Sequence, residues 1–133
     1  MKHNFCFVCS GENEKGLQVE FKLKGKKVEG TFVPGKEHQG YEGVTHGGVL
    51  ASLLDAAMNR AVLEKGLSGR TGKLVIRFFQ PAPIGFPLKV VGETIRMRRR
   101  FVLTEAEILS IDGLRLATSK GVFLIERQAN VSQ

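Results

Sequence analysis

The chain has 133 residues, of which 42% are hydrophobic and 25% are charged, and this balance is typical of one globular domain over residues 1–133. No apolar run approaches the roughly 20 residues that cross a bilayer, and residues 1–6 lack the apolar core of a signal peptide, so we expect a cytoplasmic protein without a membrane partner. The net charge of +7 is scattered, and without a recognisable nucleic-acid motif it favours an anionic small molecule over nucleic acid.

Residues 1–16 form an N-terminal lead-in that contains both cysteines. Cys6 and Cys9 are spaced Cys-x-x-Cys, with His3 three residues earlier. A structural zinc ion normally takes four protein ligands, and no second Cys or His pair follows in the sequence. A redox pair is expected at the start of a helix, whereas residues 10–13 are typical of a loop. We therefore expect two reduced, partly buried cysteines, no metal site, and no partner for His3.

Alternating apolar and polar residues predict strands at 17–23 and 28–33, joined by a turn into a hairpin. A loop at 34–45 follows. Residues 47–65 then predict a helix that is apolar on nearly all sides and ends before Gly66, which indicates a buried helix.

The apolar period changes to two after the helix and predicts four further strands. These strands are expected at 73–80, 88–99, 101–111 and 114–125, and residues 127–133 are expected to fray. Two strands, one buried helix and four strands predict an α+β fold, in which a curved antiparallel sheet of about six strands wraps around one long helix.

The few polar positions of the helix fall on one stripe. Gly48, Ser52, Asp55 and Asn59 are spaced four, three and four residues apart. Amides of Gly47 and Gly48 at the positive end of the helix are suited to a developing oxyanion. Asp55 is a carboxylate among apolar neighbours, which is costly unless it is paired or used in chemistry. Together these features suggest acyl transfer.

The spacing of these groups also predicts an oligomer. Seven residues separate Gly48 from Asp55, which is ~10 Å along a helix axis. A base and an oxyanion donor must each lie about 3 Å from the atoms they serve, so one helix can hardly supply both. A two-fold dimer with antiparallel helices brings the two groups together. One sheet and one helix also leave a flank exposed, so we expect a homodimer or a dimer of dimers.

Several segments resemble the hotdog-fold acyl-CoA thioesterases of the PaaI type. They are HQGYEGVTHGG at 38–48, LDAAM at 54–58, TGKLVIRF at 71–78 and PAPIG at 81–85. The resemblance implies a hotdog fold that hydrolyses a thioester to a carboxylate and free coenzyme A. Coenzyme A is then part of the substrate, and no separate cofactor is implied.

The resemblance also implies residue roles. The Gly47 amide would polarise the thioester carbonyl, Asp55 would attack it or activate water, and the Thr71 hydroxyl would position water or the acid. Several relatives carry Asn where this chain has Gly40, and the neighbouring Gln39 is the alternative amide.

Other polar residues leave more than one interpretation open. His46 is either a general base or a cap and brace for the loop, and we favour the second. Asn59 contacts substrate, Asp55 or a partner helix. The cluster of Arg98, Arg99 and Arg100 either holds the phosphates of coenzyme A or forms a solvated strand face.

The activity itself also has an alternative. A hotdog protein that binds acyl-CoA without cleaving it fits the same residues. The Asp and His pair that related hydratases carry near the helix start is not found, and the acyl group cannot be assigned from the sequence.

Overall fold

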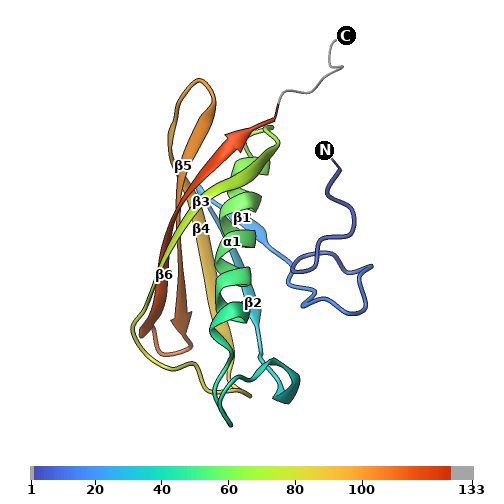
Figure 1. Ribbon diagram of the computed structural model, residues 1–133, viewed down its shortest axis with the longest axis vertical. Helices are drawn as coiled ribbons and strands as arrows, with labels where there is room; N and C mark the ends of the chain where they lie inside the picture. Colours follow the sequence, from blue (N-terminus) through green and yellow to red (C-terminus); the bar gives the residue numbers. More distant parts are fainter. Residues whose placement is uncertain (1, 127–133) are drawn as a thin grey trace.

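In the computed structural model, which describes residues 2–126, six antiparallel strands form one curved sheet with an α-helix on one face (Figure 1). The sheet order is β1-β2-β4-β5-β6-β3. The strands are β1 (Lys22–Lys24), β2 (Lys27–Phe32), β3 (Gly69–Phe78), β4 (Leu88–Met97), β5 (Phe101–Ser110) and β6 (Arg115–Ile125). Helix α1 is Gly47–Leu63, and a short 3-10 helix, η1, is Lys36–His38. The predicted hotdog arrangement of six strands and one long helix is confirmed.

Helix α1 lies in the connection from β2 to β3, and this connection passes over the three strands that separate them in the sheet, β4, β5 and β6. Its sheet-facing side chains are almost fully buried. Burial of such an apolar stripe stabilises the packing of the helix against the sheet. These residues include Leu50, Leu53, Leu54, Met58 and Val62.

The helix lies close to the sheet because two strands carry glycine beneath it. A Cβ added to Gly92 in β4 would lie 2.7 Å from the carbonyl oxygen of Ala57. A Cβ added to Gly121 in β6 would lie 3.0 Å from the sulfur of Met58. The absence of side chains at these positions therefore sets the distance between helix and sheet.

Helix α1 begins at the predicted residue and ends two residues earlier than predicted. The amides of Lys65 and Gly66 donate to the carbonyls of Val62 and Leu63, so each reaches back only three residues. Gly66 has a φ of 78°, which takes the chain out of helical geometry.

The strand predicted at 17–23 has the expected alternation of buried residues at 17–21, but these residues do not pair with β2 as predicted. Leu17, Val19 and Phe21 are buried as expected, but the ladder begins only at Lys22, and Leu23 is 54% exposed. The amides of Leu17 and Val19 instead donate to the carbonyls of Phe7 and Val8, at 2.8 and 2.7 Å. Residues of the lead-in thus take the place of a neighbouring strand.

Two other strand boundaries matter for the functional residues. Strand β4 ends at Met97 instead of 99, after an irregularity between Thr94 and Arg96 that breaks the alternation. Strand β3 begins at Gly69, four residues earlier than predicted, and therefore includes Thr71.

Residues 2–126 contain no helix with the length and apolarity that a membrane span needs. The tail at 127–133, which the sequence predicts to fray, lies outside the described residues.

We predict that Gly92→Ala lowers the free energy of unfolding by about 1–3 kcal/mol, because the added methyl group must push the backbone of α1 away from β4. Urea denaturation measures this change. Gly11→Ala is the matched control, since no atom lies within 4 Å of its added Cβ. Equal stability of the two variants would contradict the close contact.

Candidate active site

The start of α1 is held by His46, which is the N-cap residue. Its Nδ1 accepts a hydrogen bond from the amide of Gly48 at 2.7 Å. Its own amide donates to the carbonyl of His38 at 2.8 Å, and the amide of Thr45 donates to Ala82 at 2.8 Å. His46 therefore anchors the loop to the helix, which is the structural role favoured from the sequence.

The capping hydrogen bond engages only one of the two glycine amides. The Gly48 amide is occupied by His46, whereas within residues 2–126 nothing accepts the amide of Gly47. Gly47 is exposed at the first turn, where the helix dipole favours negative charge. It lines an open hollow of about 340 Å³ with Gly40, Tyr41, Val44, Thr45 and His46.

Gln39 and Gly40 shape the loop beside this hollow. The Oε1 atom of Gln39 accepts the Gly43 amide at 2.9 Å, so its carbonyl end is engaged within the loop. A Cβ on Gly40 would lie 3.3 Å from Cδ2 of His46. Glycine at this position gives the His46 ring room to cap the helix.

Asp55 and Thr71 come from different elements and meet. The Thr71 hydroxyl donates to Oδ1 of Asp55 at 2.6 Å. The register of β3 against β6 shifts between Thr71 and Lys73, a bulge of the kind that redirects side chains near functional sites. The half-buried Asp55 carboxylate is thus oriented by a strand residue 16 positions later in the chain.

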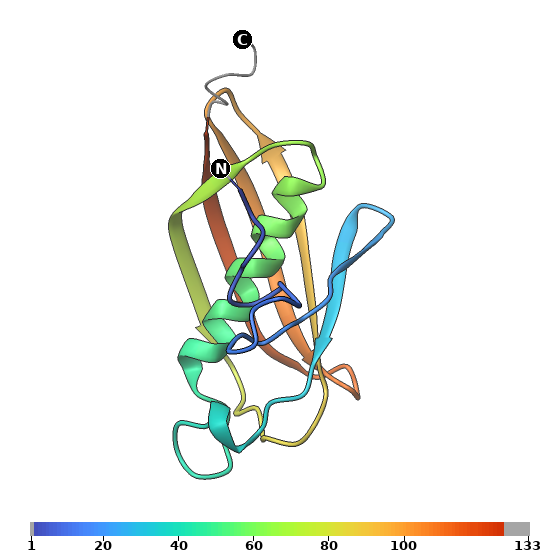
Figure 2. The same ribbon diagram turned by 90° about the vertical axis from the view of Figure 1, so that its right-hand side faces the viewer.

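Asp55 faces a hollow of about 390 Å³ between α1, the lead-in and the edge strand β3. Figure 2 shows the lead-in, in dark blue, crossing this side of the helix. Ser52 and Asn59 lie beside Asp55; the Ser52 hydroxyl donates to the Gly48 carbonyl at 2.9 Å, and Oδ1 of Asn59 is buried without a partner in the described residues. The lead-in contributes His3, Cys6, Phe7 and Val8, and β3 contributes Gly69, Arg70 and Thr71.

The two halves of the predicted site are separate within one chain. Gly47 and Asp55 are eight residues apart on a continuous helix, which is ~12 Å along its axis. The hollow at Gly47 and the hollow at Asp55 share no lining residue. One chain alone does not present both groups to a common atom.

Strand β3 forms an edge of the sheet with exposed apolar side chains. It pairs with β6 on one side only. Val75, Phe78 and Phe79 are 49%, 53% and 47% exposed, and Phe78 lies beside the start of α1, 3.8 Å from a Cβ placed on Gly47. An apolar edge strand of this kind is typical of a surface that is covered by another chain.

The arginine cluster lies elsewhere. Arg98, Arg99 and Arg100 occupy the exposed turn between β4 and β5, and the expected continuous strand face is wrong because β4 ends before them. Figures 1 and 2 place this turn at the end of the sheet opposite the start of α1.

The lead-in holds a contact that the sequence reasoning missed. His3, expected to have no partner, places Nε2 3.3 Å from the sulfur of Cys9. Burial, and next hydrogen bonding to the Cys6 thiol, raise the pKa of Cys9 to about 12, which disfavours a nucleophilic thiolate in the metal-free chain. Burial, and next Arg60, lower the pKa of His3. The spacing His-x-x-Cys-x-x-Cys was the signal available in the sequence.

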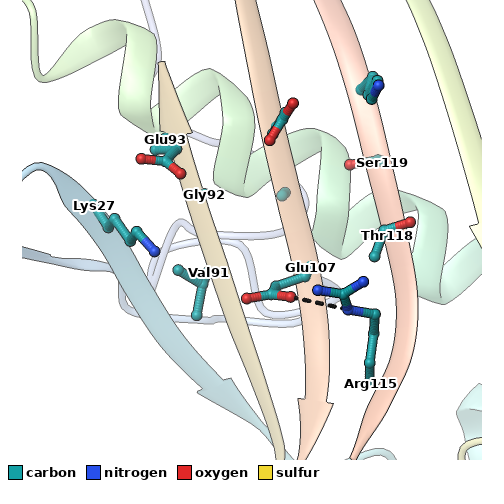
Figure 3. Close-up of a pocket in the computed structure, with 11 residues that line it drawn as sticks. Lys27, Val91, Gly92, Glu93, Glu107, Arg115, Thr118 and Ser119 are labelled. Carbon is teal, nitrogen blue, oxygen red and sulfur yellow. Dashed lines mark ion pairs between the residues drawn. The ribbon is translucent and has the colours of Figure 1, made fainter. Parts of the chain in front are cut away.

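Another hollow, of about 310 Å³, lies on the face of the sheet away from α1 (Figure 3). Its charges are balanced between basic and acidic side chains, and Glu107 pairs with Arg115 at 3.4 Å. It contains none of the predicted site residues, so we assign the chemistry to the helix side. Its charged residues are Lys27, Glu93, Glu105, Glu107, Arg115 and Lys120.

Comparisons with known proteins identify the family and the fold. The chain is 27% identical over 117 residues to the mouse acyl-coenzyme A thioesterase THEM4, covering 85% of this chain and 50% of that protein. The chain spans about half the length of the curated relatives it matches. A crystal structure of a thioesterase superfamily protein aligns with a TM-score of 0.86 at 30% identity, covering 91% of this chain and 63% of the other.

A second solved structure shares the fold at lower identity. It is a hypothetical thioesterase from Streptococcus pneumoniae solved with coenzyme A, with a TM-score of 0.78 at 22% identity, covering 83% of this chain and 87% of the other. The family profile described as thioesterase superfamily matches residues 42–117, which is more than half of the chain. That segment runs from the loop before His46 through Asp55 and Thr71, and the chain therefore belongs to the thioesterase superfamily.

Proposed function

We propose that this protein hydrolyses acyl-CoA thioesters to a carboxylate and free coenzyme A. The proposal rests on two groups carried by one helix. The first-turn amide of Gly47 is unengaged within the described residues, and the carboxylate of Asp55 is oriented by the Thr71 hydroxyl. The relatives support the substrate class, since a mouse protein is named acyl-coenzyme A thioesterase and a streptococcal structure was solved with coenzyme A.

The active unit in this proposal is a two-fold homodimer formed along the edge of β3. Antiparallel association places the start of one α1 beside the middle of the other, so Gly47 of one subunit and Asp55 of its partner face the same thioester. The exposed Val75, Phe78 and Phe79 supply apolar surface for this contact. A dimer of dimers is an extension of the same proposal.

In the proposed reaction the carbonyl oxygen accepts the Gly47 amide, where loss of one such donor typically costs about 3 kcal/mol. Asp55 either removes a proton from water as the hydroxide adds, or attacks the carbonyl to give a mixed anhydride that water opens. Either route expels the coenzyme A thiolate, which takes up a proton. The Thr71 hydrogen bond keeps Asp55 aimed at the reacting carbon or water.

The remaining site residues bind substrate in this proposal. Asn59 lines the hollow at Asp55, and Gln39 precedes Gly40, which lines the hollow at Gly47. In an antiparallel dimer, the arginine turn of one subunit lies at the same end as the start of the partner's helix. Arg98, Arg99 and Arg100 are then placed to attract the phosphates of coenzyme A.

We predict that Asp55→Asn lowers kcat/KM for acyl-CoA hydrolysis by at least ~100-fold, because the amide can neither attack nor accept the proton of water. A thiol-trapping dye follows release of coenzyme A across a panel of acyl groups. Asp112→Asn, in the exposed turn between β5 and β6, is the control and should keep the wild-type rate. Equally slow rates for wild type and Asp55→Asn would favour an acyl-CoA-binding protein.

We predict that Gly47→Pro removes the oxyanion donor and lowers kcat by roughly 100–1,000-fold, while proline is tolerated at the first helical position. His46 has a ψ of 136°, which suits a following proline. Gly47→Ala, which keeps the amide, is the control.

Mixing Gly47→Pro with Asp55→Asn subunits tests whether the site is shared. Each mixed dimer has one intact site, so random exchange should restore about a quarter of the wild-type activity. No recovery after verified subunit exchange would contradict a site built from two chains.

We predict that His46→Ala lowers the free energy of unfolding by about 1 kcal/mol through loss of the cap, whereas His46→Asn keeps most of it because Asn is a good N-cap residue. Urea denaturation of the two variants provides the comparison. A cap that contributes nothing would leave both as stable as the wild type.

A further inference from the structure

Three potential metal ligands gather in the lead-in. The imidazole of His3 and the sulfurs of Cys6 and Cys9 offer one ligand atom each, and all three atoms lie within 4.8 Å of one another. The His3 and Cys9 atoms are already 3.3 Å apart. Tetrahedral zinc with its usual bond lengths requires ligand separations of ~3.5–3.8 Å, so small rotamer changes suffice.

The turn between the two cysteines is shaped to support a thiolate. The amides of Val8 and Cys9 both donate to the sulfur of Cys6, at 3.3 and 3.4 Å. The amide of Ser10 donates to the Cys6 carbonyl at 3.2 Å and closes the turn. Two N–H groups aimed at one sulfur stabilise its charged, metal-binding form.

The ligands are carried by a packed segment. Val8 between the cysteines is 5% exposed, and the carbonyls of Phe7 and Val8 accept the amides of Leu17 and Val19. A Cβ on Gly16 would lie 2.2 Å from the carbonyl oxygen of Phe7, so the returning chain also fits closely. The position of the turn that carries Cys6 and Cys9 is therefore fixed by the fold around it.

We propose that His3, Cys6 and Cys9 bind a zinc ion, with water as the fourth ligand. Binding releases two thiol protons, and the two thiolates neutralise the charge of the ion, which suits the nearby Arg60 cation. Within residues 2–126 no fourth Cys, His, Asp or Glu joins the cluster, in keeping with an open position.

This zinc ion would hold residues 3–9 of the lead-in in one conformation. His3 and Cys6 line the same hollow as Asp55, so the ion would hold one wall of that hollow in place. The proposal stands apart from the hydrolysis, since it assigns the ion a positioning role and is measured by metal content.

The test uses the full chain, purified under reducing conditions, freed of metal with a chelator and titrated with Zn²⁺ and Co²⁺. We expect one Zn²⁺ per chain and, with Co²⁺, thiolate charge-transfer bands and the strong visible bands of a tetrahedral site. His3→Gln should weaken binding by at least roughly 100-fold, because loss of a mere supporting contact already costs 10–100-fold.

Variants of the ligands and of a neighbouring residue test whether zinc binding depends on this cluster. His3→Cys should restore binding with an added thiolate, Cys6→Ser should abolish the charge-transfer bands, and Asn4→Ala, an exposed neighbour, should leave binding unchanged. Exposed His3 can be replaced without disturbing the core, so its variants report on binding even where a cysteine variant unfolds. The proposal is overturned if the folded, reduced chain binds no Zn²⁺, if binding survives Cys6→Ser, or if the cysteines form a disulfide in place of the site.

Discussion

The close packing of α1 on the sheet is the contact on which every functional feature depends. Buried leucines and Met58 face the strands, and glycines in β4 and β6 admit the helix backbone. Because this face is fixed, the stripe with Ser52, Asp55 and Asn59 lines the hollow between the helix, the lead-in and β3. Protein interiors transmit small displacements, so the glycines of the sheet determine the position of the carboxylate indirectly.

The helix also imposes a division between its two functional groups. A rigid rod cannot bend to bring its first amide to a carboxylate two turns later, and the capping bond from His46 makes that start more rigid. The exposed edge strand β3 ends at Phe78, whose ring lies next to the helix start. In the proposed dimer, the same rigidity that separates the groups in one chain gives a fixed geometry to a site shared by two subunits.

The sequence predicted the elements well because their periodicity is strong. The buried helix and the four later strands agree with the structure. The family resemblance implies that Thr71 positions water or the acid, and in the structure its hydroxyl donates to Asp55. Contacts that depend on the tertiary structure could not be predicted from the sequence. Periodicity cannot show that residues 17–21 pair with the lead-in, that the irregularity after Thr94 ends the arginine strand, or that Gly48 gives its amide to His46.

The order of strands has a consequence for how the chain reaches this fold. Strands β4, β5 and β6 pair with their sequence neighbours, so they can assemble as a local meander. Strand β3 precedes all three and pairs only with the last, and β2 must likewise wait for β4 across the whole helix. Loop closure over such separations delays these pairings. We therefore expect the strand that carries Thr71 to join the sheet late in folding, after β6 has formed.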